Sequence, residues 1–285
     1  MIITEINGGL GNQLFQYAAG LALSSKHKTA LKINVQFNTQ DTKRKQALSN
    51  FQLDIQEAGP EEIKKYYPNS NLQRAIQKLL PAGWNKFYKE FGFAYQPSFQ
   101  YLSSDVYLKG YWQSEQYFSS IASIIKESFV LHPSCYNKAS ACIQEIESSE
   151  SVSIHVRKGD YLQSPYKDYY ATLESDYYNK AIAFLQQFSP ALKIFVFTDD
   201  TIWVKEHLRL NASFELVSGN QTNSMLEDFQ AMQSCKYHVI ANSSFSWWTA
   251  WLGSREGKQV IAPKNWFKNG PKDTEDLIPK TWHLL

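Results

Sequence analysis

The chain has 285 residues, of which 43% are hydrophobic, and a formal net charge of only +2 at pH 7. These values are typical of a globular protein with one large or two ordinary domains, and the mixed charges exclude the basic footprint of a nucleic-acid-binding protein. Three scattered cysteines argue against a disulfide framework, and the sequence contains neither a signal-peptide region nor a run of about 18 apolar residues. We therefore expect a cytoplasmic protein, with peripheral membrane association left open and no indication of the oligomeric state.

The first residues predict a strand, a glycine loop, a helix and a second strand. The strands are expected at residues 2–6 and 30–35, with the helix at about 13–27. The helix is expected because apolar residues recur at helical spacing, at Leu14, Phe15, Ala18, Leu21 and Ala22. This order is typical of the opening of a βαβ unit.

The next part of the chain is less regular. Prolines and glycines interrupt the pattern from about residue 37 to residue 100, which indicates irregular helical and loop structure. A strand is predicted at 106–112, and amphipathic helices at about 115–129 and 136–148.

Strands and helices alternate in the second half of the chain. Strands are predicted at 152–157, 193–198, 213–217, 237–241 and 259–263, and the main helices at about 176–188, at 223–235 and from near Ser246. Such alternation indicates a parallel sheet flanked by helices. Two α/β domains, residues 1–150 and 151–285, fit the pattern better than one continuous sheet.

The strand that begins at Val152 ends abruptly in charge, with the sequence His-Val-Arg-Lys-Gly-Asp-Tyr at 155–161. Side chains alternate across a strand, so His155 and Arg157 share one face. In open α/β sheets ligands bind beyond the carboxyl ends of the strands, and a guanidinium held there indicates an anionic ligand. The alternative is a solvated turn without a binding function.

The glycine loop at 8–13 follows a strand and opens a helix, which is the context in which backbone N–H groups contact phosphates. The dinucleotide fingerprint fails, because Leu14 stands where a third glycine belongs and Asn34 stands where a ribose-binding acid belongs. The Walker A pattern is also absent. The loop either directs the amides of Asn12 and Gln13 toward a ligand or is a structural turn.

Two further strand ends carry polar groups. Thr198, Asp199 and Asp200 follow one strand and would accept hydrogen bonds from a guanine edge or from sugar hydroxyls, unless they form a solvated turn. Neither these acids nor Glu227 and Asp228 form a D-x-D pattern, so we expect no metal.

The other strand end is Asn-Ser-Ser-Phe-Ser-Trp-Trp at 242–248. Ser243, Ser244 or Ser246 is expected to cap the following helix, whose N-terminus would also suit an anion. Because parallel strands open onto the same edge of a sheet, all three strand ends are expected to contribute to one site.

Four stretches of this sequence together resemble the bacterial α-1,2-fucosyltransferases of glycosyltransferase family 11. They match in order and spacing over essentially the whole chain: G-G-L-G-N-Q-L-F-Q-Y-A at 8–18, G-Y-W-Q-S at 110–114, H-V-R-K-G-D-Y at 155–161 and N-S-S-F-S-W-W at 242–248. The resemblance implies a GT-B-like fold of two facing Rossmann-type domains with parallel sheets. It also implies inverting, metal-independent transfer of L-fucose from GDP-fucose, held mainly by the C-terminal half, to O2 of a terminal β-galactose.

The resemblance also implies roles for individual residues. Arg157 would bind the diphosphate and act in catalysis, with His155 and Asp199 near the nucleotide. Lys158 replaces the usual second arginine, which keeps the charge but loses the bidentate fork.

In the same interpretation, Ser243, Ser244 and Phe245 would surround the phosphate and the base. The convergence of strand ends adds Thr198 and Asn242 to the pocket.

On the acceptor side, Asn12 would face the reaction centre, and Asp160 and Glu115 are candidates for a base. The expected acceptor is a galactose-terminated oligosaccharide or lipid-linked glycan, as in O-antigen biosynthesis. Its choice would depend on aromatic residues of the first half, namely Trp84, Phe87, Tyr88 and Trp112.

Three alternatives remain open at this stage. One is a non-catalytic nucleotide- or carbohydrate-binding protein on the same scaffold, and another is a GDP-sugar transferase that forms a different linkage. A nicotinamide-dependent oxidoreductase is disfavoured by Leu14 and Asn34.

Overall fold

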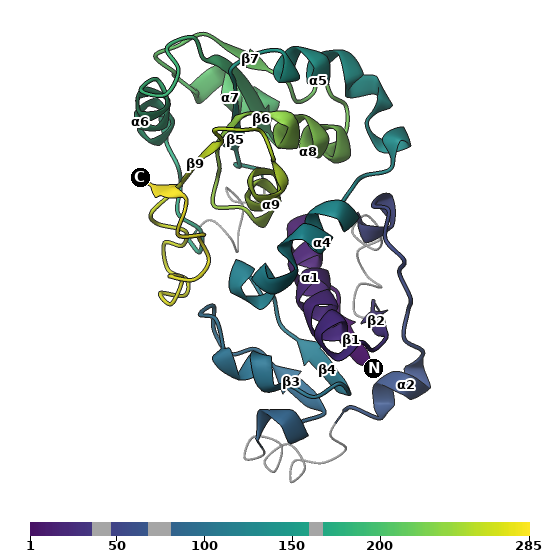
Figure 1. Cartoon of the computed structure of the whole chain (residues 1–285). Coiled ribbons are helices and arrows are strands. Elements are labelled where there is room, and N and C mark those ends of the chain that lie inside the picture. Colours follow the sequence, from purple (N-terminus) through teal and green to yellow (C-terminus); the bar gives the residue numbers. More distant parts are fainter. Residues whose placement is uncertain (36–46, 68–80, 160–167) are drawn as a thin grey trace. The chain divides into compact units, whose positions relative to one another are not determined.

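A computed structural model of the chain describes residues 1–35, 47–67, 81–159 and 168–285 (Figure 1). The chain forms two compact units, each with its own sheet. The first comprises Met1–Val130 with Asp273–Pro279, and the second comprises Leu131–Lys272 with Lys280–Leu285.

The first unit is built on a four-stranded parallel sheet of order β2-β1-β4-β3. Its strands are β1 (Ile2–Glu5), β2 (Leu31–Asn34), β3 (Phe87–Lys89) and β4 (Val106–Lys109). The expected βαβ opening is confirmed, because β1 and β2 pair in parallel and α1 (Leu10–His27) connects them. The buried side of α1 and the fully buried Ile2 and Ile3 of β1 contribute to the core of this unit.

Short helices complete the first unit. They are η2 (Ala47–Asn50), α2 (Pro60–Lys64), η3 (Ala82–Trp84), η4 (Pro97–Tyr101), η5 (Glu115–Tyr117), η6 (Ser119–Ile121) and α4 (Ala122–Ser128). The strand β3 lies within the stretch for which the sequence predicts only helices and loops. The single helix predicted at 115–129 is divided instead, because Phe118 between η5 and η6 has a non-helical backbone conformation, with φ −137° and ψ 6°.

The second unit is built on a six-stranded parallel sheet of order β10-β9-β8-β5-β6-β7. Its strands are β5 (Ser151–Val156), β6 (Lys193–Thr198), β7 (Phe214–Leu216), β8 (Tyr237–Val239), β9 (Gln259–Ala262) and β10 (His283–Leu284). Its helices are η7 (Pro133–Cys135), η8 (Asn137–Ala139), α5 (Ser140–Glu147), α6 (Ser175–Leu185), α7 (Thr201–His207), α8 (Met225–Ser234) and α9 (Ser244–Leu252).

Helices pack on both faces of this second sheet, as the alternating pattern predicts. On one face Ile154 and Val196 pack with Ala181 of α6 and Val204 of α7. On the other face the strand side chains pack with α5 and α8, through Phe195, Phe197, Cys142, Ile146, Ala231 and Met232. All six residues of β5 are buried, as befits a central strand.

The division between the units falls at Leu131, whereas the sequence predicts residues 1–150 and 151–285. The difference arises because α5, although it precedes β5, buries Cys142, Ile143 and Ile146 in the core of the second unit. The segment Asp273–Pro279 belongs to the first unit, where Asp273 accepts hydrogen bonds from Phe93 N and Ala94 N.

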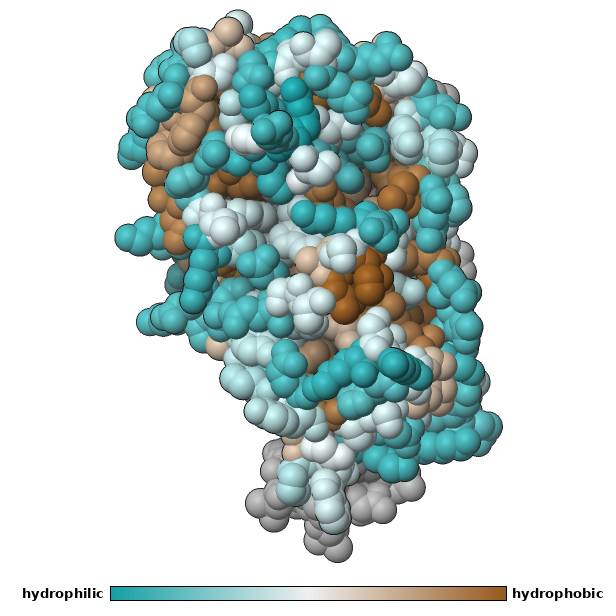
Figure 2. Space-filling model, in the orientation of Figure 1, coloured by the Kyte–Doolittle hydropathy of each residue, from teal (hydrophilic) through white to brown (hydrophobic). Residues whose placement is uncertain are grey.

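Over the described parts of the chain, every helix is too short or too polar to cross a membrane. Figure 2 shows that hydrophilic residues cover much of the surface on the face drawn there.

Candidate functional site

The carboxyl ends of β5, β6 and β8 lie side by side in the second sheet and bring the predicted site residues to one edge. Val156 pairs with Thr198, so Arg157 and Asp199 are the next residues beyond the paired ends. Ile154 pairs with Val239, so Asn242 follows β8 at the same level at which Arg157 follows β5. The expected convergence of the three strand ends is therefore confirmed.

Asp199 organises the turn that follows β5. Its Oδ2 lies 3.1 Å from Arg157 Nη1, and its Oδ1 accepts a hydrogen bond of 2.9 Å from Lys158 N. A Cβ on Gly159 would come within 2.5 Å of the same carboxylate, so only glycine allows this approach. One carboxylate thus holds both the Arg157 guanidinium and the backbone N–H of Lys158, and Gly159 leaves room for it.

The Arg157–Asp199 pair is partly open to solvent, with side-chain exposures of 28% and 24%. Ion pairs at such positions contribute little to stability, about 0–1 kcal/mol. The pair therefore matters more for the orientation of Arg157 than for the fold.

Lys158 lies in a different environment from Arg157. Its side chain is only 2% exposed, and Nζ donates to Leu173 O at 2.9 Å and lies 3.9 Å from the centre of the Trp203 ring. Nζ is also 3.2 Å from Glu174, and burial lowers the pKa of Lys158. The ammonium group that replaces the usual second arginine is therefore buried against Leu173 and Trp203.

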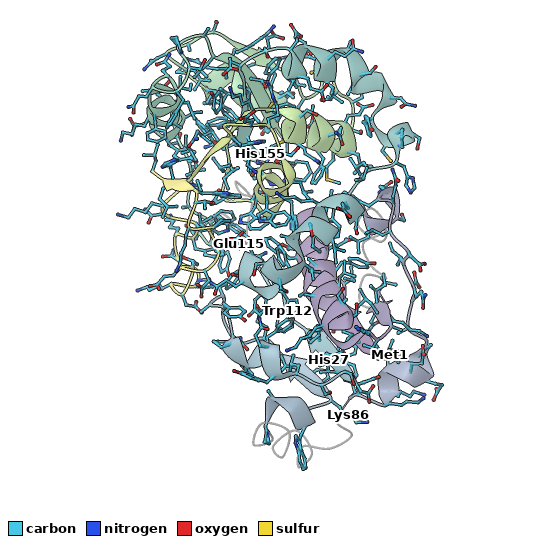
Figure 3. All side chains as sticks on the ribbon, viewed as in Figure 1. Met1, His27, Lys86, Trp112, Glu115 and His155 are labelled. Atoms are coloured by element: carbon cyan, nitrogen blue, oxygen red, sulfur yellow. The ribbon has the colours of Figure 1, made fainter. Side chains whose placement is uncertain are left out.

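His155 lies in the second unit on the same strand as the Arg157 turn (Figure 3). It is 4% exposed, and burial, with a smaller effect of Arg157, lowers its pKa to about 3. The imidazole is therefore uncharged at neutral pH. Its ring centre lies 5.7 Å from that of Phe245 on α9, so the β5 and α9 motifs meet here as predicted.

The residues at the start of α9 have distinct roles. Ser243 is the N-cap, and its Oγ accepts from Phe245 N at 3.3 Å. Asn242 is 1% exposed and donates through Nδ2 to Ala171 O and Trp266 O, both at 2.8 Å. Ser244 is the first residue of the helix and is partly exposed. The helix thus begins two residues before the predicted Ser246, which is fully buried and donates to the carbonyls of Ala241 and Ser243.

A buried polar network supports the end of β6. Thr198 N donates to Ser218 Oγ at 2.9 Å, and Ser218 Oγ donates to Asp228 Oδ2 at 2.7 Å. Thr222 also donates to this carboxylate, and burial raises the pKa of Asp228 to about 6. Sequence patterns did not reveal this network, because its residues carry no recognisable motif.

The second unit also contains a cavity of about 220 Å³, which the sequence did not predict. Its walls include Ala171, Tyr177 and Asn265. Asn242 connects two of the wall segments through its bonds to Ala171 and Trp266. The volume is below the roughly 300–1,000 Å³ of pockets for drug-sized ligands.

In the first unit, Asn12 lies in the first turn of α1, where its Oδ1 accepts a hydrogen bond of 2.7 Å from Gln113 Nε2. Glu115 begins η5 in the same unit. Asp160, the other candidate base, lies outside the described residues.

The four predicted acceptor aromatics divide into buried and accessible side chains. Trp112 is fully buried and Tyr88 is 9% exposed, whereas Trp84 is 76% exposed and Phe87 is partly buried. The Trp112 ring packs against Tyr88, Phe99 and Tyr117. Trp112 and Tyr88 therefore belong to the core of the first unit and can influence a ligand only indirectly.

Within the described residues, no group of three or more histidine, cysteine, aspartate or glutamate side chains is arranged to hold a metal ion.

The fold and the site define an α/β protein with two parallel-sheet units. At the edge of the second sheet, Asp199 orients the guanidinium of Arg157. The family model described as glycosyl transferase family 11 matches residues 1–285. The chain therefore belongs to glycosyltransferase family 11.

Two curated relatives from Escherichia coli match almost the whole chain. An α-1,2-colitosyltransferase is 30% identical over 289 residues, which cover 99% of this chain and 98% of the relative. The O-antigen biosynthesis glycosyltransferase WbnK is 28% identical over 297 residues, which cover 94% and 95% of the two chains.

Among solved structures, a GDP complex of a mutant FUT1 from Arabidopsis thaliana aligns with a TM-score of 0.51 and 11% identity. The alignment covers 99% of this chain and 75% of that one. At this identity the likeness concerns the fold alone. The predicted GT-B-like class, with two Rossmann-type units and parallel sheets, is confirmed.

Proposed function

We propose that the protein transfers L-fucose from GDP-fucose to O2 of a terminal β-galactose on a glycan acceptor, with inversion and without a metal ion. The observation that carries the proposal is the geometry of Arg157, which Asp199 and the Lys158 amide hold at the end of β5. Family membership and the two bacterial relatives support the class of reaction.

Departure of GDP places negative charge on the β-phosphate, and Arg157 is the group that would oppose it. Because Asp199 already orients the guanidinium, little reorganisation is needed when the charge develops. The first turn of α9, with Ser244 partly exposed, would supply backbone N–H groups to the same anion. His155 is uncharged, so its role would be to shape the pocket against Phe245.

The other residues of the predicted pocket would act by supporting these groups. Ser243 caps α9, Asn242 holds the segments at Ala171 and Trp266, and Thr198 connects β6 to the buried network. Lys158 is left out of the proposed donor set because its ammonium group is buried against Leu173 and Trp203.

We propose Asn12 as the first unit's contribution to the reaction, with Asp160 and Glu115 as alternative bases for the acceptor hydroxyl. A base that removes a proton in the rate-limiting step leaves its pKa in the pH profile of kcat/KM. Substituting each acid with its amide should flatten that limb for the true base, and two unchanged profiles would refute both assignments.

The experiment is to incubate the protein with GDP-fucose and a panel of β-galactosides, with and without EDTA, and to assign the product linkage by NMR. We expect an α-1,2 linkage and no effect of EDTA. A lipid-linked acceptor in the panel would show whether the protein also works at a membrane surface. Release of no GDP with any acceptor would favour the alternative of a non-catalytic binding protein.

Arg157→Ala tests the catalytic assignment. Loss of one preorganised charge-stabilising group typically costs about 100- to 1,000-fold in kcat. Arg209→Ala is the matched control, because Arg209 is a cation of the same unit whose guanidinium donates to the carbonyls of Leu208 and Glu206. Unchanged kinetics for Arg157→Ala, or an equal loss for both variants, would refute the role of Arg157.

A second donor is worth testing because one bacterial relative is a colitosyltransferase. Colitose lacks the 3-hydroxyl of fucose, so the ratio of kcat/KM values for GDP-fucose and GDP-colitose would identify the preferred sugar. A strong preference for GDP-colitose would replace fucose in the proposal and leave the proposed role of Arg157 intact.

A further inference from the structure

The turn at 110–114 in the first unit has an unusual backbone. Trp112 has a φ of +58°, in the left-handed region that disfavours bulky residues, yet its side chain is fully buried (Figure 3). Such a conformation persists only where the surroundings determine it. Two kinds of contact do so here, the aromatic packing around the indole and a carboxylate beneath the turn.

That carboxylate belongs to Glu90, which directly follows β3. Its Oε2 accepts hydrogen bonds from Tyr111 N at 2.7 Å and from Trp112 N at 2.9 Å. A Cβ on Gly110 would come within 2.5 Å of the Glu90 Cβ and within 2.6 Å of Oε2, so this close approach requires glycine.

The Glu90 carboxyl is partly withdrawn from water. Burial raises the pKa of this carboxyl above its ordinary value, although the two N–H donors lower it. Withdrawing a carboxyl group from water costs free energy unless hydrogen bonds compensate. Its use here indicates that the orientation of the two N–H groups matters.

The turn leads directly to the glycine loop. Gln113 follows Trp112, and its Nε2 donates to Asn12 Oδ1 at 2.7 Å. The same bond directs the Asn12 Nδ2 away from Gln113 and against Gly8, where a Cβ would lie within 2.9 Å of it and where φ is +75°. The backbone of Trp112 therefore determines where Gln113 meets Asn12.

We infer that Glu90 is a positioning residue: by binding the N–H groups of Tyr111 and Trp112, it fixes the turn through which Gln113 orients Asn12 for sugar transfer. Because this role presupposes the transferase reaction and the part proposed above for Asn12, its test includes a measurement that needs no substrate.

The kinetic test compares Glu90→Gln with a matched control. Asp273→Asn is that control, because Asp273 also accepts from two consecutive backbone N–H groups of the first unit, Phe93 and Ala94, but has no hydrogen bond to the 110–114 turn. Misplacement of a reacting group by about 1 Å can cost about 100-fold in rate. We expect Glu90→Gln to lower kcat about 10-fold, Glu90→Ala about 100-fold and Asp273→Asn less than about 2-fold, all with unchanged KM for GDP-fucose.

A double-mutant cycle separates positioning from general destabilisation. If Glu90 acts through Asn12, Glu90→Gln should lower kcat no further in an Asn12→Ala background. Additive losses, or an unchanged kcat in Glu90→Gln alone, would overturn the inference. If Glu90→Ala fails to fold, the cycle that combines Glu90→Gln with Asn12→Ala still tests whether Glu90 acts through Asn12.

Hydrogen exchange supplies the substrate-free measurement. Glu90→Gln should accelerate amide exchange at 110–114 and also at 8–16, where Gln13 N donates to Gly9 O, whereas Asp273→Asn should not. Acceleration confined to 110–114 would overturn the inference. If the wild-type protein transfers no sugar, the proposed function fails, and the exchange result still decides whether Glu90 positions Asn12.

Discussion

The second unit should become unstable in mild acid because two buried histidines are held uncharged. His238 on β8 is 1% exposed, and burial, with a smaller effect of Lys258, lowers its pKa from 6.5 to about 3. His155 has the same shift, with burial again the main cause. We choose His238 for the test, because His155 belongs to the proposed sugar-donor pocket.

The direction of the change in stability with pH depends on whether the folded or the unfolded state binds the proton more strongly. The unfolded imidazole takes up a proton near pH 6.5, and the folded one does so only near pH 3. Stability from His238 is therefore fully present above pH 6.5 and is lost as the pH falls toward 3. At pH 5 the loss is about 2 kcal/mol, at 1.36 kcal/mol for each pH unit below 6.5.

His238→Leu removes the titration while roughly keeping the buried volume. The free energy of unfolding, relative to wild type, should rise by about 2 kcal/mol between pH 7.5 and pH 5. Urea unfolding followed by tryptophan fluorescence suits this measurement, because all tryptophans except Trp84 and Trp112 lie in the second unit.

Val239→Ala is the control for the His238 experiment, since Val239 is the buried neighbour on the same strand and does not titrate. It should destabilise the unit equally at both pH values. Parallel pH profiles for His238→Leu and wild type would refute the reasoning.

Three further predictions concern residues of the second unit. Asp199→Asn should leave the affinity for GDP, measured by calorimetry, unchanged or slightly tighter and should lower kcat about 10-fold, because the substitution removes the ion pair that orients the Arg157 guanidinium. A loss of affinity with unchanged kcat would contradict this prediction. Lys158→Arg should lower the free energy of unfolding by about 1–3 kcal/mol, because a larger head group must fit where Nζ now contacts Leu173 O and the Trp203 ring. The variant should not bind GDP more tightly. Tighter GDP binding would show that the side chain at this position reaches the ligand. The pKa of Asp228 is raised from 3.8 to about 6, so this carboxyl contributes stability that is fully present below pH 3.8 and is lost as the pH rises through 6, roughly 3 kcal/mol in all. Asp228→Asn should remove this pH dependence from the free energy of unfolding measured in urea. If the pH dependence is retained, another group causes it.

Much of the second unit could be predicted from its sequence because local signals and tertiary structure agree there. Apolar strands alternate with amphipathic helices, and each polar strand end falls where a parallel sheet presents its ligand edge. The meeting of the His155 and Phe245 motifs follows from that topology alone. The positions of polar strand ends therefore carried more information than any single motif.

The direction of individual side chains could not be predicted in the same way. Lys158 and Arg157 are adjacent in the sequence and chemically alike, but both lie beyond Val156, the last residue of β5, where strand alternation no longer determines the direction of a side chain. One of them consequently forms an ion pair with Asp199, and the other lies against Trp203.

The first unit was harder to predict because its structure depends on contacts between distant residues. The three-residue strand β3 is too short to show a period, and it exists because it pairs with β4. Glu90 looks like a surface acid in the sequence. Its partial burial follows only from the turn that contains Gly110 and Trp112, whose hydrogen-bond donors lie 21 and 22 residues further along the chain.

The Arg157–Asp199 pair also explains why a phosphate-binding arginine would be held by an acid at all. The carboxylate weakens the attraction of the guanidinium for an anionic nucleotide, so maximum affinity for GDP would favour an unpaired arginine. Catalysis gains only from interactions that are stronger in the transition state than in the bound substrate. In the proposed reaction, an arginine whose direction is fixed by Asp199, itself held by Lys158 N, would lose ground-state attraction but would meet the charge on departing GDP without reorganising. The two quantities separate in Asp199→Asn, where kcat should fall while the affinity for GDP stays unchanged or becomes slightly tighter.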